Sequence, residues 1–179
     1  MEKQDLLDFL DHWENMELLF HDREQAIIHF PVLMEIALSG NGKLNWRASW
    51  AADKINTLIP GIAAPWIDKL VDLLPSLCHP GKKRQFLKLI SLYPVPADSA
   101  GFLFDFCLER LASPAEEISI KAYSMQILYN ISEMEPGLKP ELLQILEEEN
   151  EHHTSAGVLS KAKTLMSRLR KEIKKPPIS

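Results

Sequence analysis

Two stretches of the sequence decide the fold. PSLCHPGKKRQFLKLI (residues 75–90) and LASPAEEISIKAYSMQIL (residues 111–128) share one layout: the apolar end of a helix, a short turn with proline, and a basic residue that opens the next helix. Internal repetition with a period of a few tens of residues is the sequence signature of stacked helical or strand units. The rest of the chain is therefore searched for the same unit.

A basic residue recurs at the opening of the second helix along the chain. The five residues 118–122 also align with residues 158–162. A repeat of this length with two helices indicates a solenoid, in which each repeat buries its apolar face against its neighbours. We therefore predict an all-α fold, a right-handed α-α superhelix of the armadillo type, with about four helix pairs. The recurring basic positions are Arg47, Arg84, Lys121 and Lys161, at intervals of 37, 37 and 40 residues.

Glycine and proline divide the chain into segments of helix length. All seven glycines interrupt the apolar periodicity, and such residues mark helix ends. Between them the spacing is helical, as at Val158, Ala162 and Leu165, and no segment alternates apolar with polar residues as a half-buried strand does. We expect one domain over 1–173 and a disordered C-terminal tail over 174–179, because the tail holds two prolines.

The same punctuation predicts individual helix ends. Asn45 is of a type that caps helices, and we expect it to precede a helix that opens at Trp46. Pro114 suits the first position of a helix, where its missing N–H costs nothing. Pro31 is expected to end or kink a helix that begins near Asp22.

The second helices open in a recurring way, with an apolar residue, a basic residue and then small or apolar residues. The two clearest openings are Trp46-Arg47 with Ala51 and Ala52, and Ile120-Lys121 with Leu128.

These openings resemble the HEAT-repeat family, whose first helix leads through an Asp-Pro turn to a second helix that starts Val-Arg and continues with alanines. Pro80 and Pro114 match the turn proline, while His79 and Ser113 stand where that family has Asp. The resemblance covers about residues 22–172 and extends to small uncharacterised bacterial HEAT-like proteins. It implies a helical repeat fold and no reaction.

Composition places the chain among globular proteins. Hydrophobic residues make up 46% of the sequence and charged residues 25%, an ordinary balance for a soluble domain. No apolar run approaches the ~20 residues that cross a bilayer, and the first residues are acidic where a signal peptide is apolar. We expect a cytoplasmic protein without membrane contact. Cys78 and Cys107 are too few for a disulfide framework and are expected to be reduced, buried thiols.

Charge is divided unevenly along the chain. Residues 1–160 hold 24 of the 25 acids and 13 of the 20 Lys and Arg, a net charge of −11, whereas residues 161–179 hold seven bases and one acid, a net charge of +6. Phosphate contacts dominate nucleic-acid affinity and need a basic face, so the acidic body argues against a nucleic-acid clamp. The basic end leaves a local anionic contact open.

The common enzyme motifs are absent. The sequence has no G-x-x-x-x-G-K-[ST], G-x-G-x-x-G, H-E-x-x-H or G-x-S-x-G. His152 and His153 adjoin, but neighbours on a helix point about 100° apart and do not share a metal without further ligands. We expect no cofactor and no metal, and we favour a protein without enzymatic activity.

Three cations gather at one predicted helix start, and a fourth, Lys88, follows in the same helix. Lys82, Lys83 and Arg84 follow Pro80, where free N–H groups and the helix dipole also attract an anion. We therefore interpret this helix start as an anion-binding site. The alternative is that Arg84 pairs with an acid of the previous repeat.

Two tryptophans lie one turn apart on the predicted helix that also carries Arg47. Trp46 and Trp50 are large enough to fill gaps between stacked repeats, and packing of this kind is the usual role of Trp. If they are exposed beside Arg47 and Arg84, they mark a ligand or peptide groove instead.

These observations favour a non-enzymatic interaction scaffold that holds a protein or peptide partner on its concave face. The basic side chains of this face would then project ~10 Å apart and attract an acidic segment, or they would brace the repeats internally. The residues concerned are Arg47, Arg84 and Lys121. The alternative function is a nucleic-acid enzyme, since alkylation-repair DNA glycosylases also have HEAT-like repeats. The identity of the partner and the oligomeric state stay open.

Overall fold

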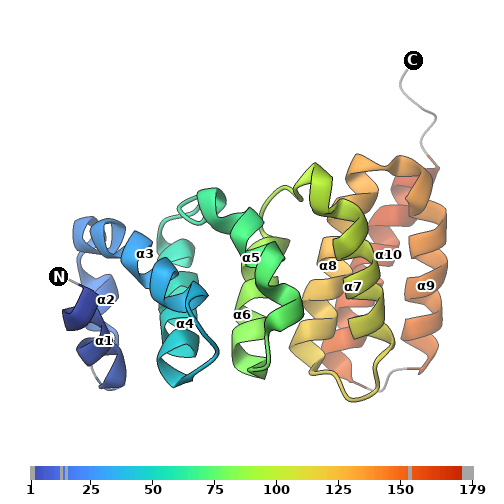
Figure 1. Cartoon of the computed structure of the whole chain (residues 1–179). Helices are drawn as coiled ribbons and strands as arrows, with labels where there is room; N and C mark the ends of the chain where they lie inside the picture. Colours follow the sequence, from blue (N-terminus) through green and yellow to red (C-terminus); the bar gives the residue numbers. More distant parts are fainter. Residues whose placement is uncertain (1–2, 13, 15, 153–154, 175–179) are drawn as a thin grey trace. The chain divides into compact units, whose positions relative to one another are not determined.

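The computed structural model describes residues 3–12, 14, 16–152 and 155–174, and among these residues it contains helices and no strands (Figure 1). The chain divides into two compact units, residues 1–93 and 94–179. Each unit is built from helix pairs in which a first helix packs against a second.

Unit 1 begins with two short helices and continues with two helix pairs. The pairs are α3 with α4, and α5 with α6. In chain order the elements are α1 (Lys3–Asp11), α2 (Leu18–His21), α3 (Arg23–Leu38), α4 (Lys43–Leu58), the 3-10 turn η2 (Ala64–Trp66), α5 (Ile67–Leu73), the 3-10 turn η3 (Leu74–Ser76) and α6 (Pro80–Ser91).

Unit 2 also holds two helix pairs, α7 with α8 and α9 with α10. The expectation of an all-α fold with about four helix pairs is therefore confirmed in the described residues. The elements are η4 (Ala97–Ser99), α7 (Ala100–Ala112), α8 (Ile118–Met134), η5 (Pro136–Leu138), α9 (Lys139–His152) and α10 (Ala156–Ile173).

The cores lie between the helices of each pair, and the helical periodicity of the sequence builds them. Ala48, Ala51 and Ala52 of α4 are fully buried, and such small side chains let the backbone of α3 approach closely. In unit 2 the stripe predicted for α10 is confirmed. Its buried members are Val158, Ala162, Leu165, Met166 and Leu169.

Several helix ends differ from the sequence expectations. α4 begins at Lys43, and Asn45 lies inside its first turn, where its Oδ1 accepts a hydrogen bond from Gly42 N at 2.9 Å. Pro31 does not end α3, which runs on to Leu38, and a kink at this residue stays a prediction. Pro114 lies in the turn before α8, not at its start. The predicted helix start near Asp22 is confirmed, since α3 begins at Arg23 and the Asp22 side chain accepts hydrogen bonds from two backbone N–H groups.

A glycine in the first turn of α6 fixes how closely α4 and α6 meet. A Cβ on Gly81 would stand 2.6 Å from Trp46 Nε1 and 3.2 Å from His79 Cε1, both parts of packed rings. A Cβ on Gly101, in the first turn of α7, would meet nothing within 4 Å.

We predict opposite effects for the same substitution at these two glycines. Gly81→Ala should lower the free energy of unfolding by about 1–3 kcal/mol, because the new methyl overpacks the contact with Trp46. Gly101→Ala should raise it by about 0.5 kcal/mol through the better helix propensity of alanine. Chemical denaturation of the two variants checks this, and equal effects would contradict the close approach at Gly81.

Candidate functional site

The basic side chain of Arg47 reaches the end of a neighbouring helix. Its Nη1 donates to the carbonyls of Leu10 at 2.7 Å and Asp11 at 2.6 Å, the last residues of α1. The Asp11 carboxylate lies 3.8 Å from the same nitrogen, and the Arg47 side chain is only 12% exposed. The final carbonyls of a helix lack partners within the helix and carry its negative dipole end, so a cation there satisfies both needs.

Lys82 and Lys121 also donate to backbone carbonyls, at the C-terminal ends of α3 and α7. Lys82 Nζ donates to the carbonyl of Gly40, just beyond α3, and Lys121 Nζ donates to the carbonyl of Leu111 near the end of α7 at 2.8 Å. Both lysines are almost completely buried, at 1% and 3% exposure. Burial lowers the pKa of Lys82 to about 8. These contacts show Arg47, Lys82 and Lys121 bracing neighbouring helices, which is the alternative that the sequence left open for Arg47 and Lys121. A role of these residues in partner binding stays a prediction.

The three cations predicted at the start of α6 do not project together. Lys82 points into the core, whereas Lys83 and Arg84 are half-buried and make contacts of their own. The His79 ring already accepts a hydrogen bond from Lys82 N at 3.3 Å, so one free N–H of this helix start is occupied. Anion binding there stays a prediction.

The tryptophans of α4 have different surroundings. Trp46 is half-buried and stacks on His79, with ring centroids 5.6 Å apart and planes tilted by 15°. Trp50 lies 5.8 Å from the Phe20 ring, and Lys54 Nζ lies 5.2 Å above Trp50. Trp50 and Lys54 also line a pocket of about 320 Å³ between α2 and α4.

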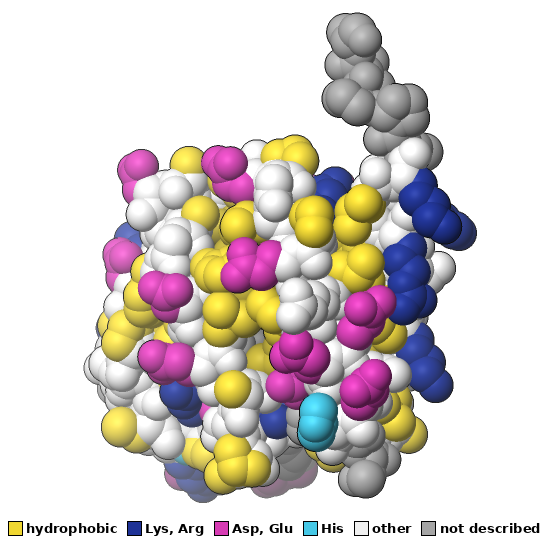
Figure 2. Space-filling model, turned by 90° about the vertical axis from the view of Figure 1, so that its right-hand side faces the viewer, with side chains coloured by type: hydrophobic (Ala, Val, Ile, Leu, Met, Phe, Trp, Pro, Cys, Tyr) yellow, Lys and Arg dark blue, Asp and Glu magenta, His cyan; other side chains and the backbone are white. Residues whose placement is uncertain are grey.

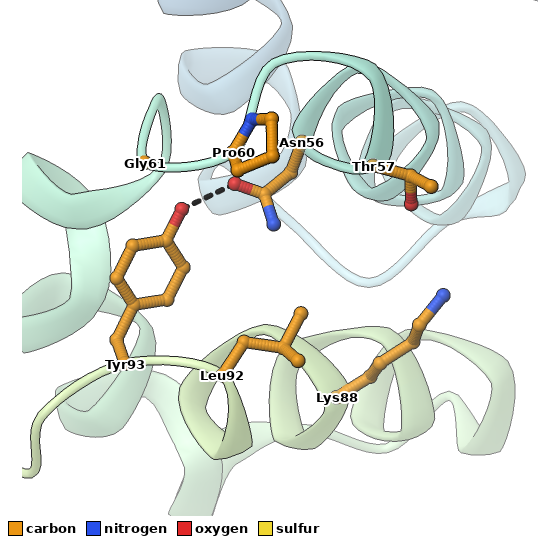
Figure 3. Close-up of a pocket in the computed structure, with 7 residues that line it drawn as sticks. All are labelled: Asn56, Thr57, Pro60, Gly61, Lys88, Leu92 and Tyr93. Carbon is orange, nitrogen blue, oxygen red and sulfur yellow. Dashed lines mark hydrogen bonds between the residues drawn. The ribbon is translucent and has the colours of Figure 1, made fainter.

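A larger pocket, of about 460 Å³, opens between the second helices α4 and α6. Its apolar walls come from Pro60, Leu92 and the ring of Tyr93 (Figure 3). Leu92 is 59% exposed, so this apolar side chain is available to a ligand. The full lining is Asn56, Thr57, Pro60, Gly61, Lys88, Leu92 and Tyr93.

Hydrogen bonds orient the polar groups of this pocket. The Tyr93 hydroxyl donates to Asn56 Oδ1 and accepts from Ala63 N at 3.1 Å. Because the amide oxygen is engaged, the amide nitrogen of Asn56 faces the space between α4 and α6 (Figure 3). The pocket therefore presents an N–H donor beside an apolar wall.

An ion pair forms the charged edge of the pocket. Lys88 Nζ lies 2.7 Å from Asp53 Oδ2, and the Asp53 side chain is 4% exposed while that of Lys88 is 31% exposed. The second oxygen of Asp53 is buried without a hydrogen-bond partner. The lysine thus neutralises a buried carboxylate, and its partly exposed side chain still lines the pocket.

Sequence reasoning did not find this pocket. It noted Lys88 only as a cation that follows the predicted helix start. The signal available was the i, i+4 spacing of Lys88 and Leu92, which puts a cation and an exposed apolar side chain on one face of α6. Asn56 and Thr57 carry no signal of their own.

Other predicted features are resolved by burial. Both cysteines are free, as expected, but Cys78 is exposed, which corrects the expectation of two buried thiols. Cys107 is buried, and burial raises its pKa to about 12. Within the described residues no group of three His, Cys, Asp or Glu could hold a metal ion, and none of the helices combines the length and apolar character that a membrane span requires. His153 lies outside the described residues.

Comparison with known families is consistent with this architecture. A family model for the HEAT repeat domain matches residues 6–169, which include the four helix pairs except the last residues of α10. The chain belongs to the HEAT repeat domain family. The match crosses both units, and a single domain over 1–173 stays a prediction. No curated protein and no solved structure shows a significant match.

Two departures from the HEAT pattern now have a structural meaning. At the turn before α6, the His79 ring takes the capping role expected of the family's Asp, through its acceptor Nδ1. At the turn before α8 the Ser113 side chain makes no such cap, because α8 begins only at Ile118.

The bracing contacts give a stability prediction. Arg47→Ala should lower the free energy of unfolding by about 2–3 kcal/mol, because two partly buried carbonyls at the end of α1 lose a charged donor. Lys43→Ala is the matched control, since Lys43 lies on the same helix and pairs with the same Asp11 at 3.0 Å, but both side chains are 60% exposed. It should cost less than about 0.5 kcal/mol. Urea unfolding of both variants measures the difference, and an Arg47→Ala variant as stable as the control would argue for a surface role.

Proposed function

We propose that this HEAT repeat protein is a non-enzymatic scaffold that binds an extended segment of a partner protein on the second helices of unit 1. The observation that carries the proposal is the pocket between α4 and α6, where an exposed Leu92 lies beside the Asn56 amide and the Lys88 ammonium. At about 460 Å³ it is within the range of small-molecule and side-chain sites, roughly 300–1,000 Å³.

The surface available to such a segment extends along α4. Trp50, Lys54 and Thr57 are spaced i, i+4 and i+7, which places them on one face of the helix. Trp50 and Lys54 line the pocket on the α2 side, and Thr57 lines the pocket on the α6 side. A chain lying across α4 can therefore place side chains in both pockets.

The chemistry of the α4–α6 pocket selects the residues of the segment. Pro60, Leu92 and the Tyr93 ring receive an aliphatic side chain, whose burial supplies about 1.5–3 kcal/mol. The Asn56 amide and the Lys88 ammonium donate hydrogen bonds, which suit a backbone carbonyl or a carboxylate. We infer an aliphatic residue next to an acidic one, in line with the acidic partner expected from the sequence.

The alternative, a repair-type nucleic-acid enzyme, gains no support from this pocket. Its lining contains no carboxylate that could serve as a general acid or base. The net charge of −11 over residues 1–160 repels a polyanion. The cytoplasmic location also stays a prediction.

A peptide selection tests the proposed function. We expect a phage-displayed peptide library panned on the full chain to yield sequences that share an aliphatic residue beside Asp or Glu. Leu92→Asp should weaken the selected peptides by about 10- to 100-fold, because the apolar wall is lost and a like charge is placed near the ligand acid. Fluorescence anisotropy with a labelled peptide measures the change.

The matched control is Ile28→Asp. Ile28 is also 59% exposed but lies on the first helix α3, away from both pockets. This variant should bind the peptide like the wild type, and circular dichroism should show both variants folded. An equal loss of peptide affinity in both variants would contradict the assignment of the pocket. An unchanged affinity in Leu92→Asp would also contradict it.

A further inference from the structure

We propose that copies of this chain associate head to tail, with the basic outer face of α10 of one copy against the acidic N-terminal segment of the next. The two terminal segments carry opposite charges of equal size. Residues 1–24 hold eight acids against Lys3 and Arg23, a net charge of −6, and residues 161–179 have a net charge of +6.

The outer face of α10 carries several basic side chains. Lys163, Arg170, Lys171 and Lys174 are all exposed and lie opposite the buried apolar stripe of the same helix. Figure 2 shows Lys and Arg side chains in a column below the C-terminal end of the chain. Arg170 pairs with Glu147 at 2.7 Å. No hydrogen bond or ion pair joins Lys163, Lys171 or Lys174 to another described residue, so their charges are available to a partner.

The outer face of α1 is its acidic counterpart. Leu6 and Leu10 are fully buried against the rest of unit 1, so the opposite side of the helix faces solvent. Asp5 and Asp8 lie on that side and are exposed, and Asp11 is 60% exposed. Each copy therefore carries one acidic and one basic helix face.

Charge complementarity favours a second copy over a nucleic acid as the occupant of α10. A polyanion that approaches α10 also approaches a body with a net charge of −11 over residues 1–160, whereas a second copy presents its acidic terminus to a basic surface. The two faces differ, so the contact is heterologous and every added copy leaves one face of each kind open. Such a contact joins successive copies into chains, or into rings where the rotation closes, and its extent depends on concentration.

Exposed ion pairs are individually weak, and this sets the expected strength. Each contributes roughly 0–1 kcal/mol, so association should be weak and should need low salt. The attraction between exposed charges reaches over about 20–30 Å at 10–20 mM salt but only about 8 Å at physiological ionic strength. The contact should therefore nearly vanish by about 300 mM salt.

Sedimentation of the full chain tests the proposal. In 20 mM NaCl the weight-average mass should exceed the 20.4 kDa of one chain and rise with protein concentration, and in 300 mM NaCl it should return to 20.4 kDa. Lys163→Glu/Lys171→Glu alone and Asp5→Lys/Asp8→Lys alone should each abolish the rise at low salt. A monomer at every salt concentration overturns the proposal.

Mixing the two variants provides the decisive experiment. In the mixture the reversed α10 of one variant meets the reversed α1 of the other, and the two unchanged faces also meet, so association at low salt should return. Asp68→Lys/Asp72→Lys is the matched control, because it changes the charge by the same amount on exposed positions of α5. It should associate like the wild type.

Two outcomes reassign the basic face. If reversal on α10 prevents association but reversal on α1 does not, the basic face meets another surface and the proposed pairing is wrong. If the wild type is monomeric in 20 mM NaCl yet binds a 20-base-pair DNA duplex, and reversal on α10 abolishes that binding, the basic face serves nucleic acid and self-association is overturned. Neither outcome bears on the peptide pocket of unit 1.

Discussion

Buried cations at the ends of first helices are the constraint on which the repeat packing depends. A helix that ends inside a stack exposes carbonyls where water does not reach, and each buried carbonyl without a donor costs about 1–3 kcal/mol. Arg47, Lys82 and Lys121 supply those donors from a neighbouring second helix. Their side chains are long enough to reach the end of a neighbouring helix, and buried alanines allow the helices to pack closely. The close packing therefore depends on these donors, because it removes water from the helix ends.

The repeat was readable from the sequence because its period is set by stacking. The punctuation by glycine and proline and the apolar stripes gave the helix pairs, and the stripe of α10 is buried as expected. The basic position was assigned two residues too late in the α6 repeat. Lys82 enters the core, not Arg84, and a run of three cations gives no indication of which one turns inward. Only the exact start of α6 at Pro80 decides that.

The pocket was not readable from the sequence for a different reason. Its walls come from the end of α4, the following turn and the end of α6, and they meet only because the Tyr93 hydroxyl bridges Asn56 and the backbone of Ala63. Tyr93 fits an apolar stripe equally well when its hydroxyl points elsewhere. Periodicity assigns a residue to a face of its own helix, but it does not report which polar atoms of two helices come together.

The junction of His79, Trp46 and Gly81 fixes the chemical state of one imidazole. Since Nδ1 accepts a hydrogen bond from Lys82 N, the ring proton of neutral His79 resides on Nε2, a tautomer with a distinct nitrogen-15 chemical shift pattern. Because the indole of Trp46 stacks on the same ring, the fluorescence emission of Trp46 depends on whether this helix start is intact.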